Sequence, residues 1–343
     1  MIEFKPIHIH KKHLMPNESE RSERSELLLV RSANQCLVDA NLRPIPQMLF
    51  AEFWHEGEIC ILFADSNLGK SILGVQIADS ISSGKYIPGF AMKTEKQPVL
   101  YFDFEMSDKQ FENRYSIDYR LHYMFDENFK RVMINPECSE FEDFEKQLFI
   151  AIERAVISCN AKVLVIDNLT YLKTQATDTS KEALPLMKEL KKLAHKHNLS
   201  ILALAHTPKR CHQNPITMND LAGSKMLSNF ADSIFAIGPS SQDTNLRYIK
   251  QIKARATAIV YDSGNVILCK ISKDYNRLIF QMEDFSNENE HLRVQNDGDS
   301  SEINKQIVEQ KKQNPNWSYS QIAQTLGSNK TQVGRVLKKN GLA

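Results

Sequence analysis

The sequence predicts an α/β protein with a mostly parallel sheet, followed by a small all-α domain. Over the middle of the chain, short and continuously apolar segments alternate with amphipathic helical stretches. This alternation is typical of parallel strands that helices cover on both faces. Beyond a polar, acidic stretch, three short helical patterns contain seven Lys or Arg and two Glu, which is a net charge of about +5.

Composition restricts the possible classes of protein. The chain has 343 residues, 42% hydrophobic and 25% charged, which is typical of a soluble protein with two domains. Its net charge of +1 creates no overall field for nucleic acid, so such binding needs a local patch. No apolar run approaches the roughly 18 residues of a membrane helix, and the first residues lack the apolar segment of a signal peptide. The six cysteines include no CxxC pair, which favours a reduced, cytoplasmic protein without disulfides or structural zinc. We also expect no membrane partner, because no apolar run is long enough.

We expect four parts along the chain. Residues 1–44 form an N-terminal arm with a helix at 26–40, and residues 45–282 form the α/β core. Residues 283–301 are polar and almost free of apolar periodicity, so they are expected to be a linker. Residues 302–343 form the all-α domain.

Within the core, strands and helices are expected to alternate. The strands are expected at 58–64, 98–104, 131–135, 162–167, 199–206, 232–238, 247–254, 265–271 and 277–282. The helices are expected at about 70–83, 107–122, 141–159 and 181–197. Asp-Ser-Gly and Asp-Tyr-Asn turns separate the last three strands, which predicts antiparallel hairpins that extend the sheet.

The sharpest motif is Ala64-Asp-Ser-Asn-Leu-Gly69-Lys70-Ser71, between an expected strand and an expected helix. It matches the P-loop pattern GxxxxGK[ST], except that Ala64 replaces the first Gly and must therefore use an ordinary backbone conformation. Backbone N–H groups of such a loop face phosphates, the lysine contacts the β- and γ-phosphates, and the Ser71 hydroxyl coordinates Mg²⁺. The expected nucleotide-contacting residues are Ala64, Asp65, Ser66, Asn67, Leu68, Gly69, Lys70, Ser71 and Ile72.

A second motif is the apolar strand VLVIDN at 163–168, which ends in Asp167. An Asp at the carboxyl end of a buried parallel strand lies beside the P-loop and can hold Mg²⁺ through water. Alone this signal is weak, because many buried strands end in Asp. Combined with the P-loop, it predicts a magnesium site formed by Ser71 and Asp167.

Four further segments make a family resemblance specific: PVLYFDFEMS (98–107), ILALAHTPK (201–209), AGSKMLSNFADSIFAI (222–237) and IKQIKARATA (249–258). With the P-loop they resemble RecA-like ATPases over about 45–282. The likeness is most specific to the RepA-like hexameric helicases of plasmids and mobile elements, which are AAA family ATPases, and to the related RadA-type ATPases. The resemblance implies a RecA-like fold, ATP and Mg²⁺ as cofactors, and a homo-oligomer, expected to be a hexamer, that hydrolyses ATP between subunits.

The resemblance also implies catalytic roles. Glu105 matches the glutamate that activates water, and Asp103, which points to the same face, is the alternative if the register differs by two. His206 matches the sensor that couples the phosphate state to DNA-contacting loops. The competing interpretations are a surface acid at Glu105 and a core-edge histidine at His206.

Two cations at i and i+2, Lys253 and Arg255, are expected on one face of a strand. The resemblance implies an arginine finger and a partner lysine that reach the nucleotide of a neighbouring subunit. Solvated surface cations are the alternative.

After the sensor strand, RecA-like proteins place a loop that touches single-stranded DNA, so Lys209 and Arg210 of segment 207–219 are candidate phosphate contacts. The segment lacks aromatic residues, and an ordinary mobile loop fits it equally well.

The tail pattern SxxQIAxxLGxxxxxVxRxLKK, which starts at Ser318, resembles winged-helix and related helix-turn-helix domains of bacterial regulators and replication proteins. The resemblance implies that the third helix enters the major groove of duplex DNA. A helical protein-docking domain is the alternative. The expected DNA-contacting residues are Lys330, Thr331, Gln332 and Arg335 at bases, and Lys338 and Lys339 at phosphates.

These observations together favour an ATP-dependent DNA motor, most specifically a replicative helicase of a mobile element. One alternative is a regulator in which ATP switches assembly and the tail binds a specific duplex site without unwinding it. Another is a RadA-like recombination ATPase that binds single strands without translocating along them.

Overall fold

The computed structural model describes residues 28–137, 143–172, 180–208, 210–221, 224–293, 297–328 and 330–342. It separates into two compact units, Met1–Ile45 and Pro46–Ala343. In the first unit, helix α1 (Ala33–Asn41) begins after Ser32, whose side chain accepts a hydrogen bond from the backbone N–H of Gln35. The helix begins later than expected from the sequence, and none of its residues is buried.

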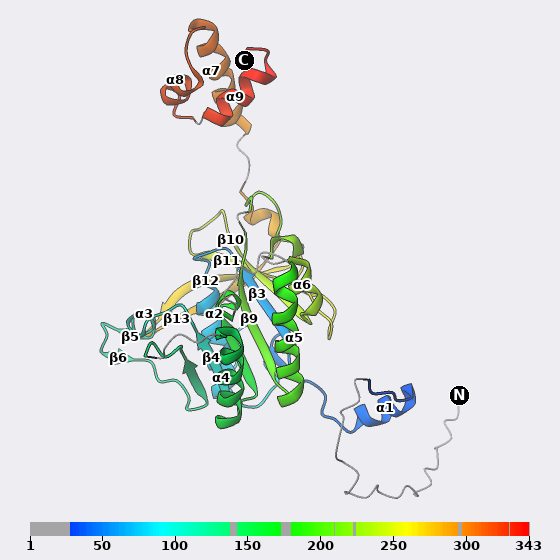
Figure 1. The fold of residues 1–343 in the computed structure, drawn as a ribbon. Coiled ribbons are helices and arrows are strands. Elements are labelled where there is room, and N and C mark those ends of the chain that lie inside the picture. Colours follow the sequence, from blue (N-terminus) through cyan, green and yellow to red (C-terminus); the bar gives the residue numbers. More distant parts are fainter. Residues whose placement is uncertain are drawn as a thin grey trace, which may run out of the picture. The chain divides into compact units, whose positions relative to one another are not determined.

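A nine-stranded sheet forms the centre of the second unit (Figure 1). Its strands are β3 (Ile59–Ala64), β4 (Val99–Asp103), β7 (Phe129–Val132), β8 (Val163–Asp167), β9 (Ser200–His206), β10 (Ser233–Pro239), β11 (Leu246–Lys253), β12 (Val266–Asp274) and β13 (Arg277–Ser286). Their order is β13-β12-β11-β10-β3-β9-β8-β4-β7. The strands from β10 to β7 pair in parallel, and β11, β12 and β13 continue the sheet antiparallel. The predicted α/β class with a mostly parallel sheet is therefore confirmed.

Helices pack on both faces of this sheet. The helices of the core are α2 (Lys70–Ser83), α3 (Asp108–Arg114), α4 (Phe144–Ser158), α5 (Ser180–His197) and α6 (Ser224–Phe230). Leu73 of α2 shares one hydrophobic cluster with Tyr101 of β4, whereas Leu190 of α5 shares the other with Leu100 of the same strand. Successive residues of a strand point to opposite faces, so each continuously apolar strand supplies both clusters.

The prediction of a helix at 107–122 is wrong for the second half of that segment. After α3 the chain forms a short antiparallel pair, β5 (Ser116–Ile117) and β6 (Leu121–His122). Asp118 and Tyr119 between them have φ angles of 48° and 56°, which are left-handed values that an α-helix excludes. Another short pair that the sequence analysis did not expect, β1 (Met48–Phe50) and β2 (Trp54–His55), precedes β3.

The chain stays packed in the core beyond residue 282, where a linker was expected at 283–301. Strand β13 runs past this point, and the 3-10 helix η4 (Glu288–His291) follows it. Glu288 is fully buried, with its Oε2 2.6 Å from Nζ of Lys250 and its Oε1 accepting a hydrogen bond from the Tyr248 hydroxyl. Its acidic side chain was expected in solvent, but a lysine from the sheet neutralises it inside the protein.

The described part of the tail forms three helices, α7 (Asp297–Gln313), α8 (Tyr319–Thr325) and α9 (Lys330–Lys339), as predicted. Helix α7 begins inside the expected linker. Ser318 and Gln321 form a reciprocal capping box at the start of α8, and Gly327 after it has a φ of 61° that favours glycine. The helices enclose a small core of Ile307, Ile322, Ala323, Val333, Val336 and Leu337. None of the helices in the described residues is long and apolar enough to cross a membrane.

We expect Lys250→Met to lower the free energy of unfolding by about 3–5 kcal/mol, because Glu288 would keep a buried charge without its partner. Nζ of Lys250 also donates to the Ile216 carbonyl and the Ser263 hydroxyl, both at 2.7 Å. Urea denaturation measures the change. The control is Lys270→Met on the neighbouring strand, where the side chain is exposed and a change of about 0.5 kcal/mol or less is expected. Similar stabilities of the two variants would contradict a structural role for the buried pair.

Candidate nucleotide-binding site

The P-loop follows β3 and leads directly into α2. Ala64 is the last residue of β3 and pairs with His206 of β9, so it adopts the ordinary strand conformation that replacing Gly requires. Gly69, immediately before α2, has a φ of 94°. A Cβ atom there would lie 2.8 Å from both the Ile271 and the Phe280 side chains, so only glycine fits.

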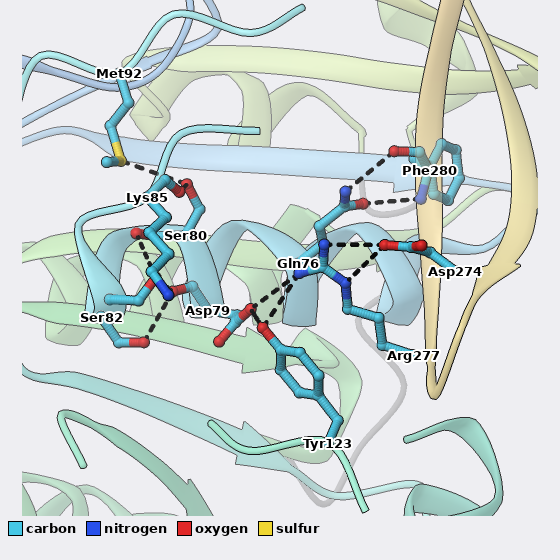
Figure 2. A network of polar contacts seen from close by, with 11 residues as sticks. Gln76, Asp79, Ser80, Ser82, Lys85, Met92, Tyr123, Asp274, Arg277 and Phe280 are labelled. Carbon is cyan, nitrogen blue, oxygen red and sulfur yellow. Dashed lines mark hydrogen bonds and ion pairs between the residues drawn. The ribbon is translucent and has the colours of Figure 1, made fainter. Parts of the chain in front are cut away.

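The antiparallel strands β12 and β13 therefore pack directly against the phosphate-binding loop. Gln76 of α2 holds β13 in place by donating to the Phe280 carbonyl at 3.0 Å and accepting from the Phe280 N–H at 2.8 Å. Figure 2 shows this pair, and beside it Asp79 between Tyr123 and Arg277. The Tyr123 hydroxyl donates to Asp79 at 2.7 Å, and burial raises the pKa of that carboxyl. These contacts fix α2, and with it the loop.

Lys70 lies inside the loop and is only 7% exposed. Its Nζ donates to the carbonyls of Ala64 at 2.9 Å and Asp65 at 3.2 Å, and lies 3.2 Å from Nδ1 of His206. Burial lowers the pKa of this lysine, although nearby carboxylates favour its charged form. The ammonium group is thus held at the mouth of the loop, where a phosphate would meet it.

Asp65 connects the P-loop to the segment that follows β9. Its carboxylate accepts a hydrogen bond from the Thr207 hydroxyl and lies 2.9 Å from Nε2 of His212. These partners offset a negative charge that would otherwise repel a phosphate. Sequence reasoning missed both partners, although Thr207 directly follows the expected sensor residue.

Asp167 and Ser71, the two residues expected to hold Mg²⁺, lie in contact with each other. Asp167 is 1% exposed and accepts hydrogen bonds from the Tyr101 hydroxyl at 2.6 Å and from the Ser71 side chain. Burial raises the pKa of Asp167 to about 6. A hydroxyl and one carboxylate fit Mg²⁺, which takes few protein ligands beside water and phosphate oxygens. Within the described residues no group of three or more His, Cys, Asp or Glu could hold a metal ion.

The structure distinguishes the two candidate carboxylates on β4 and just after it. Glu105 accepts a hydrogen bond from the Asn168 side-chain amide and lies 3.5 Å from Nε2 of His206. Hydrogen bonding by His206, and next by Asn168, lowers the pKa of Glu105. Asp103, in contrast, is buried and bound to Arg131 at 2.8 Å. Glu105, and not Asp103, therefore shares the space around Lys70 and His206.

Asn168 is a site residue that sequence reasoning missed. Its buried amide contacts both Glu105 and His206, and Nδ2 lies 2.9 Å from Nε2 of that ring. The available signal was its position directly after Asp167, at the carboxyl end of β8. A residue at that position is carried to the same edge of the sheet as its neighbour.

Lys253 and Arg255 do not lie together on a strand, because β11 ends at Lys253. Nζ of Lys253 donates to the carbonyls of Ser228 at 2.6 Å and Ala231 at 2.7 Å, near the end of α6. Arg255 is 52% exposed and pairs with Asp232 at 2.9 Å. In this chain both cations neutralise the carboxyl end of α6, as is favourable at a helix C-terminus.

The expected DNA contacts differ in accessibility. The Arg210 side chain is only 5% exposed and lies 3.9 Å from Asp220, so its placement as an exposed phosphate contact is not supported. Lys209 lies outside the described residues. In the tail, Gln332 is half-buried and donates to Asn304 of α7 at 3.3 Å. The other expected tail contacts are exposed, as predicted: Lys330, Thr331, Arg335, Lys338 and Lys339.

We expect the binding of a Mg²⁺–nucleotide complex to strengthen about tenfold between pH 5 and pH 7, because the metal needs the ionised form of Asp167. The pKa of Asp167 is raised from its usual value of 3.8 to about 6, so between these two pH values the folded protein keeps a proton that the unfolded chain has lost. The free energy of unfolding of the free protein therefore falls as pH rises through this range. Tyr101→Phe removes a hydrogen bond that favours the ionised carboxylate and should move the midpoint to higher pH. Titration calorimetry at several pH values measures this. Tyr86→Phe, on a ring that is 68% exposed, should leave the midpoint unchanged, and a midpoint near pH 4 in the wild type would contradict the prediction.

Residues 21–211 match a family described as an AAA domain. A KaiC-like protein from the hyperthermophilic archaeon Pyrococcus horikoshii OT3 is similar at 14% identity and a TM-score of 0.46, over 66% of this chain and 90% of that one. No curated protein matches the sequence. Because the family match spans more than half of the chain and includes Lys70, Glu105, Asp167 and His206, the chain belongs to this AAA domain family.

Proposed function

We propose that this protein is an ATP-dependent DNA motor, most specifically a replicative helicase of the RepA-like type. One observation carries the proposal: Lys70, Glu105, Asn168 and His206 converge at the carboxyl edge of four neighbouring parallel strands. A lysine, a carboxylate and a sensor side chain at one point are the parts that γ-phosphate hydrolysis requires.

The chemistry follows from the position of each group. Lys70 leaves its loop carbonyls to bind phosphate oxygens, which it can reach because it already lies inside the loop. Glu105 has a lowered pKa and is therefore ionised, so it can accept a hydrogen bond from the attacking water and polarise it. Ser71 and Asp167 hold Mg²⁺, which when bound neutralises charge on the phosphates. Contacts with Thr207 and His212 offset the negative charge of Asp65, so this carboxylate does not oppose the binding of phosphate.

Hydrolysis between the subunits of a ring is part of the proposal. Arg255 is half exposed, and its guanidinium is held by a surface ion pair with Asp232 at 2.9 Å and a hydrogen bond to the Asn229 carbonyl at 3.2 Å. Breaking this ion pair costs little free energy, so the Arg255 guanidinium can bind a nucleotide phosphate of a neighbouring subunit instead. The Lys253 side chain is half-buried and donates to two backbone carbonyls at the end of α6. It would thereby hold Arg255 in a fixed position relative to α6. We propose a homo-oligomer, most specifically a hexamer.

DNA would be held at two places. Residues around Lys209, after β9, would touch single-stranded DNA, and the exposed face of α9 would bind a duplex through Arg335, Lys338 and Lys339.

The tail also favours a second candidate function. A helix-turn-helix domain usually binds specific duplex sites, which suits a regulator that ATP assembles and that does not unwind DNA. A RadA-like recombination ATPase without helicase activity is the remaining alternative.

A forked-duplex unwinding assay with coupled ATPase measurement tests the proposal. Wild-type protein should separate the strands only when ATP is present. Lys70→Ala should lose tight ATP binding, and Glu105→Gln should bind ATP but turn it over at least about 100-fold more slowly. Glu95→Gln, at an exposed position, is the matched control and should behave as wild type. ATP hydrolysis without unwinding would favour the regulator or the recombination ATPase, and normal turnover by Glu105→Gln would remove Glu105 from the mechanism.

We expect the double variant Lys338→Ala, Lys339→Ala to weaken duplex binding and to reduce the slope of log K against log salt by up to about 2, one for each lost phosphate contact. Basal ATPase activity should not change, because the ATPase residues all lie in the core. Fluorescence anisotropy with a labelled duplex at several salt concentrations measures both quantities. Lys312→Ala, an exposed lysine of α7, is the control for loss of positive charge alone. An equal effect of the control and the double variant would contradict specific docking of α9.

A further inference from the structure

The amide of Asn168 is held in one orientation. Its Oδ1 accepts hydrogen bonds from the backbone N–H of Thr170 at 2.7 Å and from the Thr170 hydroxyl. A flipped amide would turn its NH₂ group toward a backbone donor, so the oxygen must face Thr170. Both N–H groups of Nδ2 therefore face the site, one toward Glu105 Oε1 and the other toward His206 Nε2.

His206 consequently has a donor at each ring nitrogen. Nε2 lies 2.9 Å from the Asn168 amide nitrogen, and Nδ1 lies 3.2 Å from the Lys70 ammonium. A neutral imidazole has one acceptor nitrogen and one N–H, and a protonated ring has no acceptor. The ring can therefore accept from Asn168 or from Lys70, but not from both.

Lys70 is the partner that can leave. Its ammonium group has two other acceptors in the P-loop carbonyls, whereas Asn168 is 2% exposed and its amide is fixed by Thr170. A phosphate in the loop would draw the ammonium group toward itself and away from Nδ1. Nδ1 could then carry the proton, and Nε2 could accept from Asn168.

We propose that Asn168 is a positioning residue that fixes the Nδ1–H tautomer of His206 when phosphate withdraws Lys70, and so orients Glu105. The inference rests on the proposed function, because it concerns the same reaction. In the free protein Lys70 and Asn168 compete for the ring: when Nδ1 accepts from Lys70, the proton is on Nε2, which then faces the Glu105 carboxylate at 3.5 Å and cannot accept from Asn168. On phosphate binding, the proton on Nε2 leaves to solvent and another binds Nδ1, so the ring stays neutral. An N–H donor then replaces the ammonium group beside the phosphate, and Glu105 is held by Asn168 instead of His206.

Nitrogen-15 NMR of histidine-labelled, full-length protein tests the tautomer directly. His206→Gln identifies the signal, and the probe is Mg²⁺ with a non-hydrolysable ATP analogue. In the wild-type ring the population of the Nε2–H form should fall and that of the Nδ1–H form should rise on addition of the probe. In Asn168→Asp the new carboxylate accepts from Nε2–H, so the ring should keep that form in both states. A wild-type ring with the same tautomer in both states would overturn the proposal.

Kinetics supply a second test that a purely structural role would not reproduce. Asn168→Ala and Asn168→Asp should each lower kcat about 100-fold, because the water-activating carboxylate loses its support, while KM and analogue affinity stay within about twofold. Asn265→Asp, in a loop where the amide donates to the Val260 carbonyl at 3.0 Å, is the matched control. Wild-type turnover in both Asn168 variants would overturn this inference and leave the proposed ATPase intact. A wild-type protein that fails to bind the analogue would instead overturn the proposed function together with the inference.

Discussion

The register of four neighbouring parallel strands is the constraint on which the site depends. Ala64 on β3 pairs with His206 on β9, and Asp103 on β4 pairs with Asp167 on β8. Because parallel strands end at one edge of the sheet, this register brings the P-loop, Glu105 and His206 together from distant parts of the chain. A slip of one residue in any of these strands would turn its side chains to the opposite face and dismantle the site.

The sequence predicted those parts of the site that carry a local signal. The continuously apolar strands, the P-loop and Asp167 are each recognisable from a few consecutive residues, and the structure places them as expected. Glu105 and His206 came from a family resemblance, and the structure places both beside Lys70. Asn168 and His212 were not predictable, because an amide or imidazole acts through partners on other strands. No local pattern encodes such contacts across strands.

Charged residues account for most of the differences between expectation and structure. Arg210 and Lys253 were interpreted as accessible, and Glu288 lies in the segment expected to be a linker, since charged side chains are usually solvated. Arg210 is instead turned toward Asp220, Lys253 binds the end of α6, and Glu288 is buried on Lys250. The sequence shows that a charge is present, but the partner that would draw it into the protein becomes visible only once the fold is known.

The close packing at Gly69 has a consequence for biosynthesis. The loop touches Ile271 and Phe280, and Gln76, one turn into the following helix, is hydrogen-bonded to a backbone 204 residues further along the chain. A nascent chain on the ribosome therefore holds an unfinished ATP pocket until these last strands emerge. Premature binding of nucleotide during translation is thereby disfavoured, and the site becomes complete only after β13 has left the ribosome.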